Sequence, residues 1–257
     1  MPISASAVSS LRQRTGVSIS ACKDALEEAG GDEEKAIEIL RKRGIAQAAK
    51  KAARDQREGR IFAEATDKKA AIILLGCETD FVARDDGLLS LGTDLVHVLL
   101  TEGKERSGEE AKKRMPEAVQ KLGENISVVE AHLIESPVIG TYVHSNGKIG
   151  VVIGLNGGTQ SMARDIAMHA AAMNPTVVSP EDVPEAAVVK EKEIWKEQLA
   201  KEGKPQQIIE KIMIGKEKKF REEHALLKQE FVKEPEKRVE EYLGSVHIEH
   251  YLRLEVS

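Results

Sequence analysis

The chain has 257 residues, enough for one large or two modest domains with a packed core. Hydrophobic residues make up 41% of it but aromatic residues only 3%, so the core must be built mainly from aliphatic side chains. Charged residues reach 32% and nearly balance at a net charge of −5, whereas nucleic-acid-binding domains usually carry a strong basic excess. The composition therefore disfavours direct nucleic-acid binding.

Two cysteines, Cys22 and Cys77, offer neither a disulfide framework nor a metal quartet, and they fit a reducing compartment. The first residues lack the basic and apolar regions of a signal peptide. In addition, no apolar run approaches the ~20 residues that a membrane span requires. We therefore expect a cytoplasmic protein without a membrane partner.

Residues 1–45 have the pattern of a small three-helix docking module. The helices are predicted from about Ser6 to Arg14, from Ser18 to Ala29, and from an Asp32 cap to about Gly44. Residues 46–58, rich in Ala, Lys and Arg, are expected to form a basic linker. Such a basic run is usually a solvated surface, although a patch for an anionic partner is the alternative.

A pattern that occurs twice predicts two related α+β subdomains. In residues 59–139, two apolar runs joined by a polar turn lead into a helix. In residues 140–257, Asn146-Gly147 joins two strand-like runs, a strong hairpin signal because both of its residues adopt positive φ. Asn125 to Ile134 and Val246 to Val256 each supply a third strand. The predicted fold class is α+β, with small antiparallel sheets covered by helices.

Residues 184–227, inserted in the second subdomain, differ in character from the rest. Glu and Lys dominate there, narrow apolar stripes run on both sides of the break at Gly203-Lys204-Pro205, and the pattern predicts a projecting coiled-coil hairpin of two antiparallel helices. Trp195 is expected to pack in its seam. Phe231 to Leu243 is predicted to be a short helix that leads back to the last strand.

A strand-to-helix corner is predicted between an apolar strand and an amphipathic helix over Val82 to Leu100. Thr79 or Asp80 suits the N-cap, because a side-chain oxygen there can accept from the unpaired amides of the first turn. This places Phe81 in the first helical turn. Its ring can pack under its own sheet, which is the commoner outcome, or project into a partner as a wedge.

Signatures of catalysis or cofactor binding do not emerge from the sequence. The glycines around Gly154 do not form a phosphate loop, the histidines lack metal-ligand spacing, and no nucleophile stands beside a base in a known motif. Cys77 is expected to be a small buried residue, and His169 a core or surface residue. We therefore predict no catalytic residue, metal or cofactor, and a protein that works by contact.

Several segments match one known family, and they run in order along nearly the whole chain. They are Leu11-Arg-Gln-Arg-Thr-Gly16, Cys22-Lys23, Gly31-Asp32, Ala48-Ala-Lys-Lys-Ala52, Cys77-Glu-Thr-Asp-Phe-Val-Ala-Arg84, Gly123-Glu-Asn-Ile126, Ile166-Ala-Met-His169, Lys204-Pro205 and Phe231-Val-Lys-Glu-Pro235. The Thr-Asp-Phe-Val-Ala piece is highly specific. By these segments the chain resembles the elongation factor Ts family, the nucleotide-exchange partners of the GTPase elongation factor Tu.

The resemblance implies a ubiquitin-associated-like N-terminal module, a core of two related subdomains and a protruding coiled coil. It also implies a partner, elongation factor Tu in its GDP-bound and nucleotide-free forms, and a function in GDP release. The Asp80-Phe81 corner would contact the GTPase domain, with the ring wedged near the magnesium and phosphate side of the nucleotide site. The second subdomain would touch the third domain of the partner. The partner-contact residues implied in this way are Thr79, Asp80, Phe81, Val82, Leu122, Gly123, His144, Arg164 and Ile19.

Two other classes of function stay open from the sequence. One is an adaptor whose N-terminal module binds peptides or ubiquitin-like partners, which leaves the duplicated core and the Asp80-Phe81 corner unexplained. The other is an enzyme that uses Asp80 with His144 or His169, which has only composition behind it. An exchange factor makes and breaks no covalent bond, so the leading interpretation is a protein that is not an enzyme.

Overall fold

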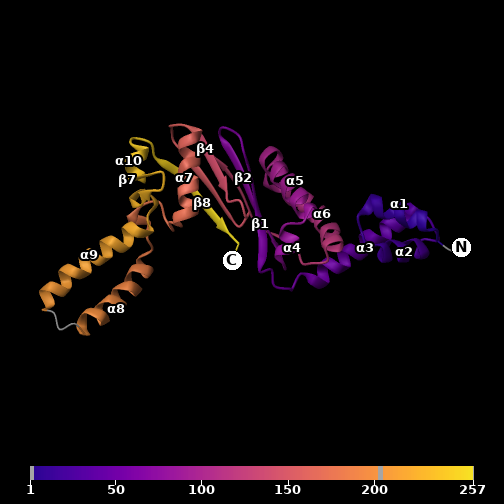
Figure 1. Cartoon of the computed structure of the whole chain (residues 1–257), viewed down its shortest axis with the longest axis horizontal. Helices are drawn as coiled ribbons and strands as arrows, with labels where there is room; N and C mark the ends of the chain where they lie inside the picture. Colours follow the sequence, from indigo (N-terminus) through magenta and orange to yellow (C-terminus); the bar gives the residue numbers. More distant parts are fainter. Residues whose placement is uncertain (1–2, 202–204, 257) are drawn as a thin grey trace.

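The computed structural model describes residues 3–201 and 205–256. The N-terminal helices lie at one end, two sheets with helices on their outer sides lie in the middle, and a helical hairpin projects at the other end (Figure 1). This mixed architecture with small antiparallel sheets confirms the predicted α+β class. None of the helices in these described ranges combines the length and apolar composition needed to cross a membrane.

The N-terminal unit consists of α1 (Ala5–Thr15), α2 (Ile19–Glu28) and α3 (Glu33–Lys51). A side-chain oxygen accepts from an otherwise unpaired amide at the start of each helix, which fixes the three starting points. The capping residues are Ser4, Ser18 and Asp32. A small aliphatic core holds the helices together, formed by Val8, Leu11, Val17, Cys22, Ala25, Leu26, Ala36 and Leu40.

Helix α3 ends later than predicted, at Lys51 rather than near Gly44. Gly44 does not stop the helix because it lies where α3 crosses α6 (Lys104–Leu122), and a Cβ there would lie 3.0 Å from the Pro116 carbonyl oxygen. The glycine therefore permits close helix packing. The first part of the segment predicted as a linker is helical, and Ala48 packs against the core under the first sheet.

The first sheet contains β1 (Glu58–Ala65), β2 (Lys69–Cys77) and β3 (Ser127–Glu135), antiparallel and in that order. The third strand appears where the sequence predicted it. Helices α5 (Asp86–Glu102) and α6 pack on one face over Ile73, Leu75 and other apolar side chains. Gly92 on α5 allows this approach, because a Cβ there would overlap the Phe62 ring.

The second sheet has the same pattern, with β5 (Ile149–Leu155) between β4 (Val138–Val143) and β8 (Ile248–Glu255). Helix α7 (Gln160–Met173) packs on one face. The predicted Asn146-Gly147 turn joins β4 to β5. Of the two residues predicted to have positive φ, only Gly147 does, at 72°. The prediction is wrong for Asn146, whose side-chain Oδ1 instead accepts from the Lys148 amide at 2.9 Å.

The faces that the helices leave uncovered pack against each other. Alternate residues of β2 serve the two cores: Ile73 and Leu75 face the helices, whereas Ile72 and Leu74 join Ile139 and other side chains between the sheets. Each such aliphatic side chain contributes about 1.5–3 kcal/mol when fully buried. The body is therefore a stack of helices, sheet, sheet and helix, visible in Figure 1.

The hairpin is formed by α8 (Glu185–Lys201) and α9 (Gln206–His224). Trp195 is 9% exposed and meets Phe220 edge-on with ring centroids 5.8 Å apart, so the predicted seam packing is confirmed. At the base, the Arg221 guanidinium donates to Glu185 and to the Val183 carbonyl oxygen, beside the short helix η1 (Pro180–Asp182). The predicted Gly203-Lys204 turn lies outside the described residues.

The predicted helix over Phe231 to Leu243 is wrong in its first half. The chain forms η2 (Leu226–Lys228), the two-stranded pair β6 (Glu230–Phe231) and β7 (Glu234–Arg238), and α10 (Val239–Leu243). Pro235 lacks an amide hydrogen and disfavours a helix through this segment. Phe231 is fully buried and stacks on Tyr242 with ring centroids 4.3 Å apart, which ties the segment to the second core.

Gly140 should be irreplaceable because β4 passes directly beneath α7. A Cβ at Gly140 would overlap the Arg164 amide nitrogen and the Ala163 carbonyl carbon. We expect Gly140→Ala to lower the free energy of unfolding by about 1–3 kcal/mol in urea titrations, as overpacking does. The control is Gly108→Ala on the exposed side of α6, which meets nothing within 4 Å and should be neutral or stabilising. Equal stability of the two variants would contradict this packing.

His169 is fully buried in α7 and joins it to the segment around β6. Its Nε2 lies 3.0 Å from Gln229 Oε1, and the Val232 amide donates to Nδ1 at 3.3 Å. These partners select the neutral ring with its proton on Nε2. Burial accordingly lowers the pKa of His169 below its ordinary value, although the hydrogen bond to Gln229 acts in the opposite direction.

This burial predicts a pH dependence of stability. An exposed histidine titrates near pH 6.5, so as the pH falls the unfolded state binds a proton before the folded state does. The contribution of neutral His169 is complete above about pH 6.5 and is lost as the pH falls toward the lowered folded-state pKa. Urea midpoints between pH 7.5 and 5 should fall less steeply for His169→Gln than for the wild type. The exposed His247→Gln control should retain the wild-type slope.

Candidate functional site

The candidate site begins where β2 ends and the chain turns into α4 (Asp80–Ala83). Of the two predicted candidates, Thr79 and Asp80, the N-cap is Thr79, and its hydroxyl accepts from the Val82 amide at 3.4 Å. The predicted continuous helix over Val82 to Leu100 is wrong. The chain leaves the helical path after α4, and Asp85 then caps α5 by accepting from the Gly87 amide at 2.7 Å.

Phe81 and its neighbours have opposite environments. The Phe81 side chain is 83% exposed, whereas Val82 and Ala83 are 8% and 5% exposed and belong to the first core. Asp80 forms an ion pair with Arg84, 3.0 Å between Oδ2 and Nη2, on the surface of the same corner. The chain therefore anchors the short helix by its last two residues and presents an exposed aromatic ring beside a carboxylate.

A carboxylate from another element holds the corner in place. Glu124 Oε2 accepts from the backbone amides of Glu78 at 2.9 Å and Thr79 at 3.0 Å, and Glu124 Oε1 accepts from the Thr79 hydroxyl at 2.5 Å. In return, Glu78 Oε1 accepts from the Asn125 amide at 2.7 Å. We call these contacts, of Glu124 with Glu78 and Thr79 and of Glu78 with Asn125, the carboxylate brace. They tie the end of β2 to the turn between α6 and β3.

The brace also reaches the segment that follows α3. Arg54 Nη1 lies 3.4 Å from Glu78 Oε1. The hydrogen bond from the Asn125 amide, and secondarily the charge of Arg54, hold the pKa of Glu78 below its ordinary value, although burial acts in the opposite direction. Glu78 is therefore an ionised acceptor at neutral pH.

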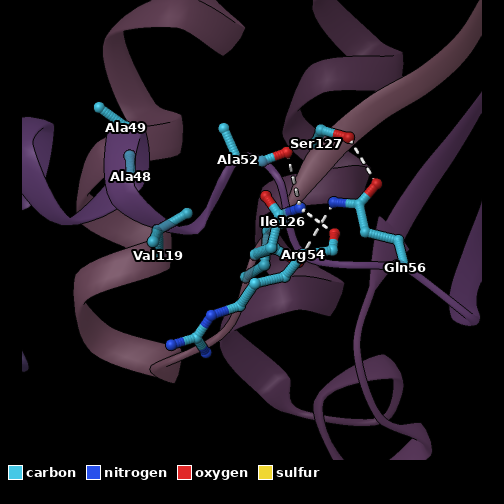
Figure 2. A pocket seen from close by; sticks show the side chains of 9 residues that line it. Ala48, Ala49, Ala52, Arg54, Gln56, Val119, Ile126 and Ser127 are labelled. Atoms are coloured by element: carbon cyan, nitrogen blue, oxygen red, sulfur yellow. Dashed lines mark hydrogen bonds between the residues drawn. The ribbon is translucent and has the colours of Figure 1, made fainter.

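A cavity of about 400 Å³ adjoins the brace. Its lining residues come from α3, the following segment, α6 and the start of β3, and they are Ala48, Ala49, Ala52, Arg54, Gln56, Val119, Asn125, Ile126 and Ser127 (Figure 2). The polar groups satisfy one another: Asn125 Nδ2 donates to the Arg54 carbonyl oxygen at 2.8 Å, and the Ser127 hydroxyl donates to Gln56 Oε1 at 2.8 Å. The apolar side chains that line this cavity are mostly small, and its polar groups are bonded to one another. We therefore interpret it as a structural contact between α3, α6 and β3.

The predicted contact residues fall into separate groups. Leu122 ends α6 and Gly123 caps it with a φ of 78°, immediately before Glu124, so this turn adjoins the corner. His144, directly after β4, and Arg164 on α7 are exposed, and the Tyr142 hydroxyl lies 3.2 Å from His144 Nδ1. Ile19, 58% exposed, begins α2 in the N-terminal unit.

The residues named for the hypothetical enzyme have other partners in the structure, and His144 lies beside the Tyr142 hydroxyl. Asp80 pairs with Arg84 on the first sheet unit, whereas His169 is enclosed in the second core with Gln229 and Val232. Burial, and secondarily the charge of Glu124, raise the pKa of Cys77 to about 12, so this thiol stays protonated. Across residues 3–201 and 205–256, no three His, Cys, Asp or Glu side chains are placed to hold a metal ion.

Sequence reasoning missed the brace, although Gly123-Glu-Asn-Ile126 was among the segments behind the family resemblance. A carboxylate two residues after a helix end, followed by an Asn and a strand, is a usable signal, because such a group can accept from free backbone amides. Its partners, Glu78 and Thr79, are more than forty residues away in the chain. Local pattern alone therefore could not pair them.

Phe81 and Val82 should respond oppositely to truncation. Phe81→Ala removes a ring that is 83% exposed, so the free energy of unfolding should change by no more than about 0.5 kcal/mol. Val82→Ala removes buried methyl groups and should lower the free energy of unfolding by about 1–2 kcal/mol. Urea titrations followed by circular dichroism measure both. A larger loss for Phe81→Ala than for Val82→Ala would mean that the ring packs against its own protein.

Comparisons with known proteins identify the family. Residues 78–257 match the family model described as Elongation factor TS. The elongation factor Ts of Marinobacter nauticus is 45% identical over 263 residues, which cover 99% of this chain and 91% of that protein. The one from Hydrogenobaculum sp. is 40% identical, covering 100% of this chain and 99% of that protein. The one from Teredinibacter turnerae is 46% identical, at 92% and 84% coverage. The chain belongs to the elongation factor Ts family.

Proposed function

We propose that this chain is a guanine-nucleotide exchange factor that binds elongation factor Tu in its GDP-bound form and promotes GDP release during translation elongation. Family membership supports the partner and the process. The observation that carries the proposal is Phe81, 83% exposed on a corner that hydrogen bonds hold in place. An exposed ring leaves about 2 kcal/mol of burial free energy unused, which a partner surface can recover.

Exchange then follows from linkage between two binding equilibria. A factor that binds the nucleotide-free conformation more tightly than the GDP-bound one weakens GDP binding by the same ratio. Each tenfold weakening requires about 1.4 kcal/mol of differential binding. Burial of the Phe81 ring against the partner can supply a contribution of that size, and no covalent bond is made or broken. On this proposal the chain needs no catalytic residue and no cofactor.

The proposed wedge is the Asp80-Phe81 corner, with Thr79 and Val82 fixing its backbone and the Leu122-Gly123 turn alongside. Insertion near the magnesium and phosphate side of the nucleotide site would disturb the cation that neutralises the phosphates. We further propose Ile19 as a second contact with the GTPase domain. The second sheet, with His144 and Arg164, would face the third domain of the partner.

We also propose that the two sheet–helix units are copies of one ancestral unit. Each has its central strand followed by a threonine N-cap, and the two caps have nearly the same backbone angles: φ −128° and ψ 156° at Thr79, φ −126° and ψ 156° at Thr159. The second helical residue is Phe81 in one copy and Ser161 in the other. Only the first copy therefore presents an aromatic wedge at this position.

The remaining parts of the proposal concern location and partners. The chain would act in the cytoplasm on a protein partner, without direct contact with nucleic acid or membrane. The adaptor alternative draws on the N-terminal unit, where Ile19 and Ile45 are 58% and 55% exposed. An adaptor would bind its partner through that unit alone, so it predicts no effect of the Asp80-Phe81 corner on any activity.

Release of a fluorescent GDP analogue from elongation factor Tu, followed by stopped flow, tests the proposal. The wild type should accelerate release, and Phe81→Ala should reduce the acceleration at least tenfold, because the wedge contact is lost. The matched control is Ile214→Ala, which truncates another exposed apolar side chain, 70% exposed on α9. It should act like the wild type.

Two outcomes would contradict parts of the proposal. If the wild type leaves GDP release unchanged with a well-matched partner, the exchange function is wrong and the adaptor gains support. If the wild type accelerates release and Phe81→Ala does so equally, the function stands but the wedge assignment is wrong.

A further inference from the structure

The orientation of Phe81 depends on groups outside its own helix. Helix α4 has four residues, and an isolated helix of that length is unstable in water. Burial of Val82 and Ala83 fixes one side of it. Its first end is joined to β2 through Thr79, whose hydroxyl caps the helix by accepting from the Val82 amide. Whatever holds Thr79 therefore sets the direction in which the ring projects.

Glu124 holds Thr79 in two ways. Its Oε2 accepts from the Thr79 amide at 3.0 Å and from the neighbouring Glu78 amide at 2.9 Å. Its Oε1 accepts the Thr79 hydroxyl hydrogen at 2.5 Å, which leaves a lone pair of the same hydroxyl for the Val82 amide. The carboxylate thus fixes both the backbone and the cap of α4. Hydrogen bonds to an ionised acceptor are stronger than neutral ones.

Glu124 also connects two of the proposed contact segments. It follows Gly123, whose left-handed conformation ends α6, so the carboxylate stands directly after the Leu122-Gly123 turn. The return bond from the Asn125 amide to Glu78 Oε1 at 2.7 Å prevents the two segments from rotating about a single contact. The turn and the corner therefore move as one rigid unit.

We propose that Glu124 is a positioning residue for nucleotide exchange, which orients the Asp80-Phe81 corner and the Leu122-Gly123 turn before the partner binds. This inference rests on the proposed exchange function. Its physical basis is preorganisation: a corner already ordered in the free protein does not lose binding free energy to ordering in the complex. The effect of Glu124 on exchange then acts through Phe81, because both carboxylate oxygens of Glu124 are bonded to Glu78 and Thr79 in the brace.

A double-mutant cycle tests this role. The maximal rate constant for release of the fluorescent GDP analogue, at saturating factor, is measured for the wild type, Glu124→Ala, Phe81→Ala and the double variant. We expect Glu124→Ala to lower this rate constant at least fivefold when Phe81 is present and less than twofold when Phe81 is absent. Such non-additivity is the signature of two residues acting as a unit.

Two further variants separate positioning from general destabilisation. Glu124→Gln keeps the shape and an oxygen that can accept from both amides, so it should restore most of the rate. Glu117→Ala removes an exposed carboxylate from α6 that forms an ion pair with Lys121 at 2.8 Å, and it should act like the wild type. Hydrogen exchange at the Thr79 and Val82 amides should accelerate at least tenfold in Glu124→Ala, while the amides of β2 stay protected.

The outcomes distinguish this inference from the exchange function itself. Suppose that the wild type accelerates GDP release, but that Glu124→Ala leaves the maximal rate constant unchanged or lowers it equally with and without Phe81. Then only the positioning role is wrong. If hydrogen exchange at Thr79 and Val82 is unchanged in Glu124→Ala, the brace does not order the corner and the inference also fails. If the wild type does not accelerate release, both the proposed function and the role in exchange are overturned.

Discussion

Burial of the central strands β2 and β5 on both of their faces is the constraint on which the rest of the structure depends. A small sheet ordinarily has one face for a core and one for solvent, but here alternate side chains of β2 enter two different cores. The sheets must therefore pack against each other, and the helices can cover only the outer faces. Directly after β2 ends at Cys77, the chain turns into α4.

The same arrangement explains why the exposed ring is structurally tolerable. The strand before the corner is buried from Ala70 to Cys77, and α5 after it contributes seven buried residues, so the four residues of α4 are held between two rigid elements. The carboxylate brace then holds Thr79, which connects β2 to α4. The protein places a solvent-exposed aromatic side chain on a rigid support, which a flexible loop could not provide.

Much of the fold could be predicted from the sequence because its signals are local. The Asn146-Gly147 turn, the Thr79 cap and the alternation in the last strand each follow from a few neighbouring residues. The failures required knowledge of distant contacts. Gly44 resembles a helix end until α6 is known to cross it, and Phe231 to Leu243 resembles a helix until Phe231 is seen to enter the second core. For the site, the local pattern does not decide whether Phe81 is exposed, and it does not reveal the contacts of Glu124 with Glu78 and Thr79.

The topology of the second sheet has a consequence for synthesis of the chain on the ribosome. The first sheet is complete once β3 has emerged, at Glu135, so the N-terminal half can close its core early. The second sheet cannot, because β5 pairs with β8 at the far end of the chain, after the whole helical hairpin. Until then one edge of β5 is unpaired and apolar, the kind of edge that invites wrong pairing. Pairing of β5 with β8 is thus delayed until the hairpin has been synthesised. Meanwhile the apolar face of the already folded first sheet can cover β4 and β5.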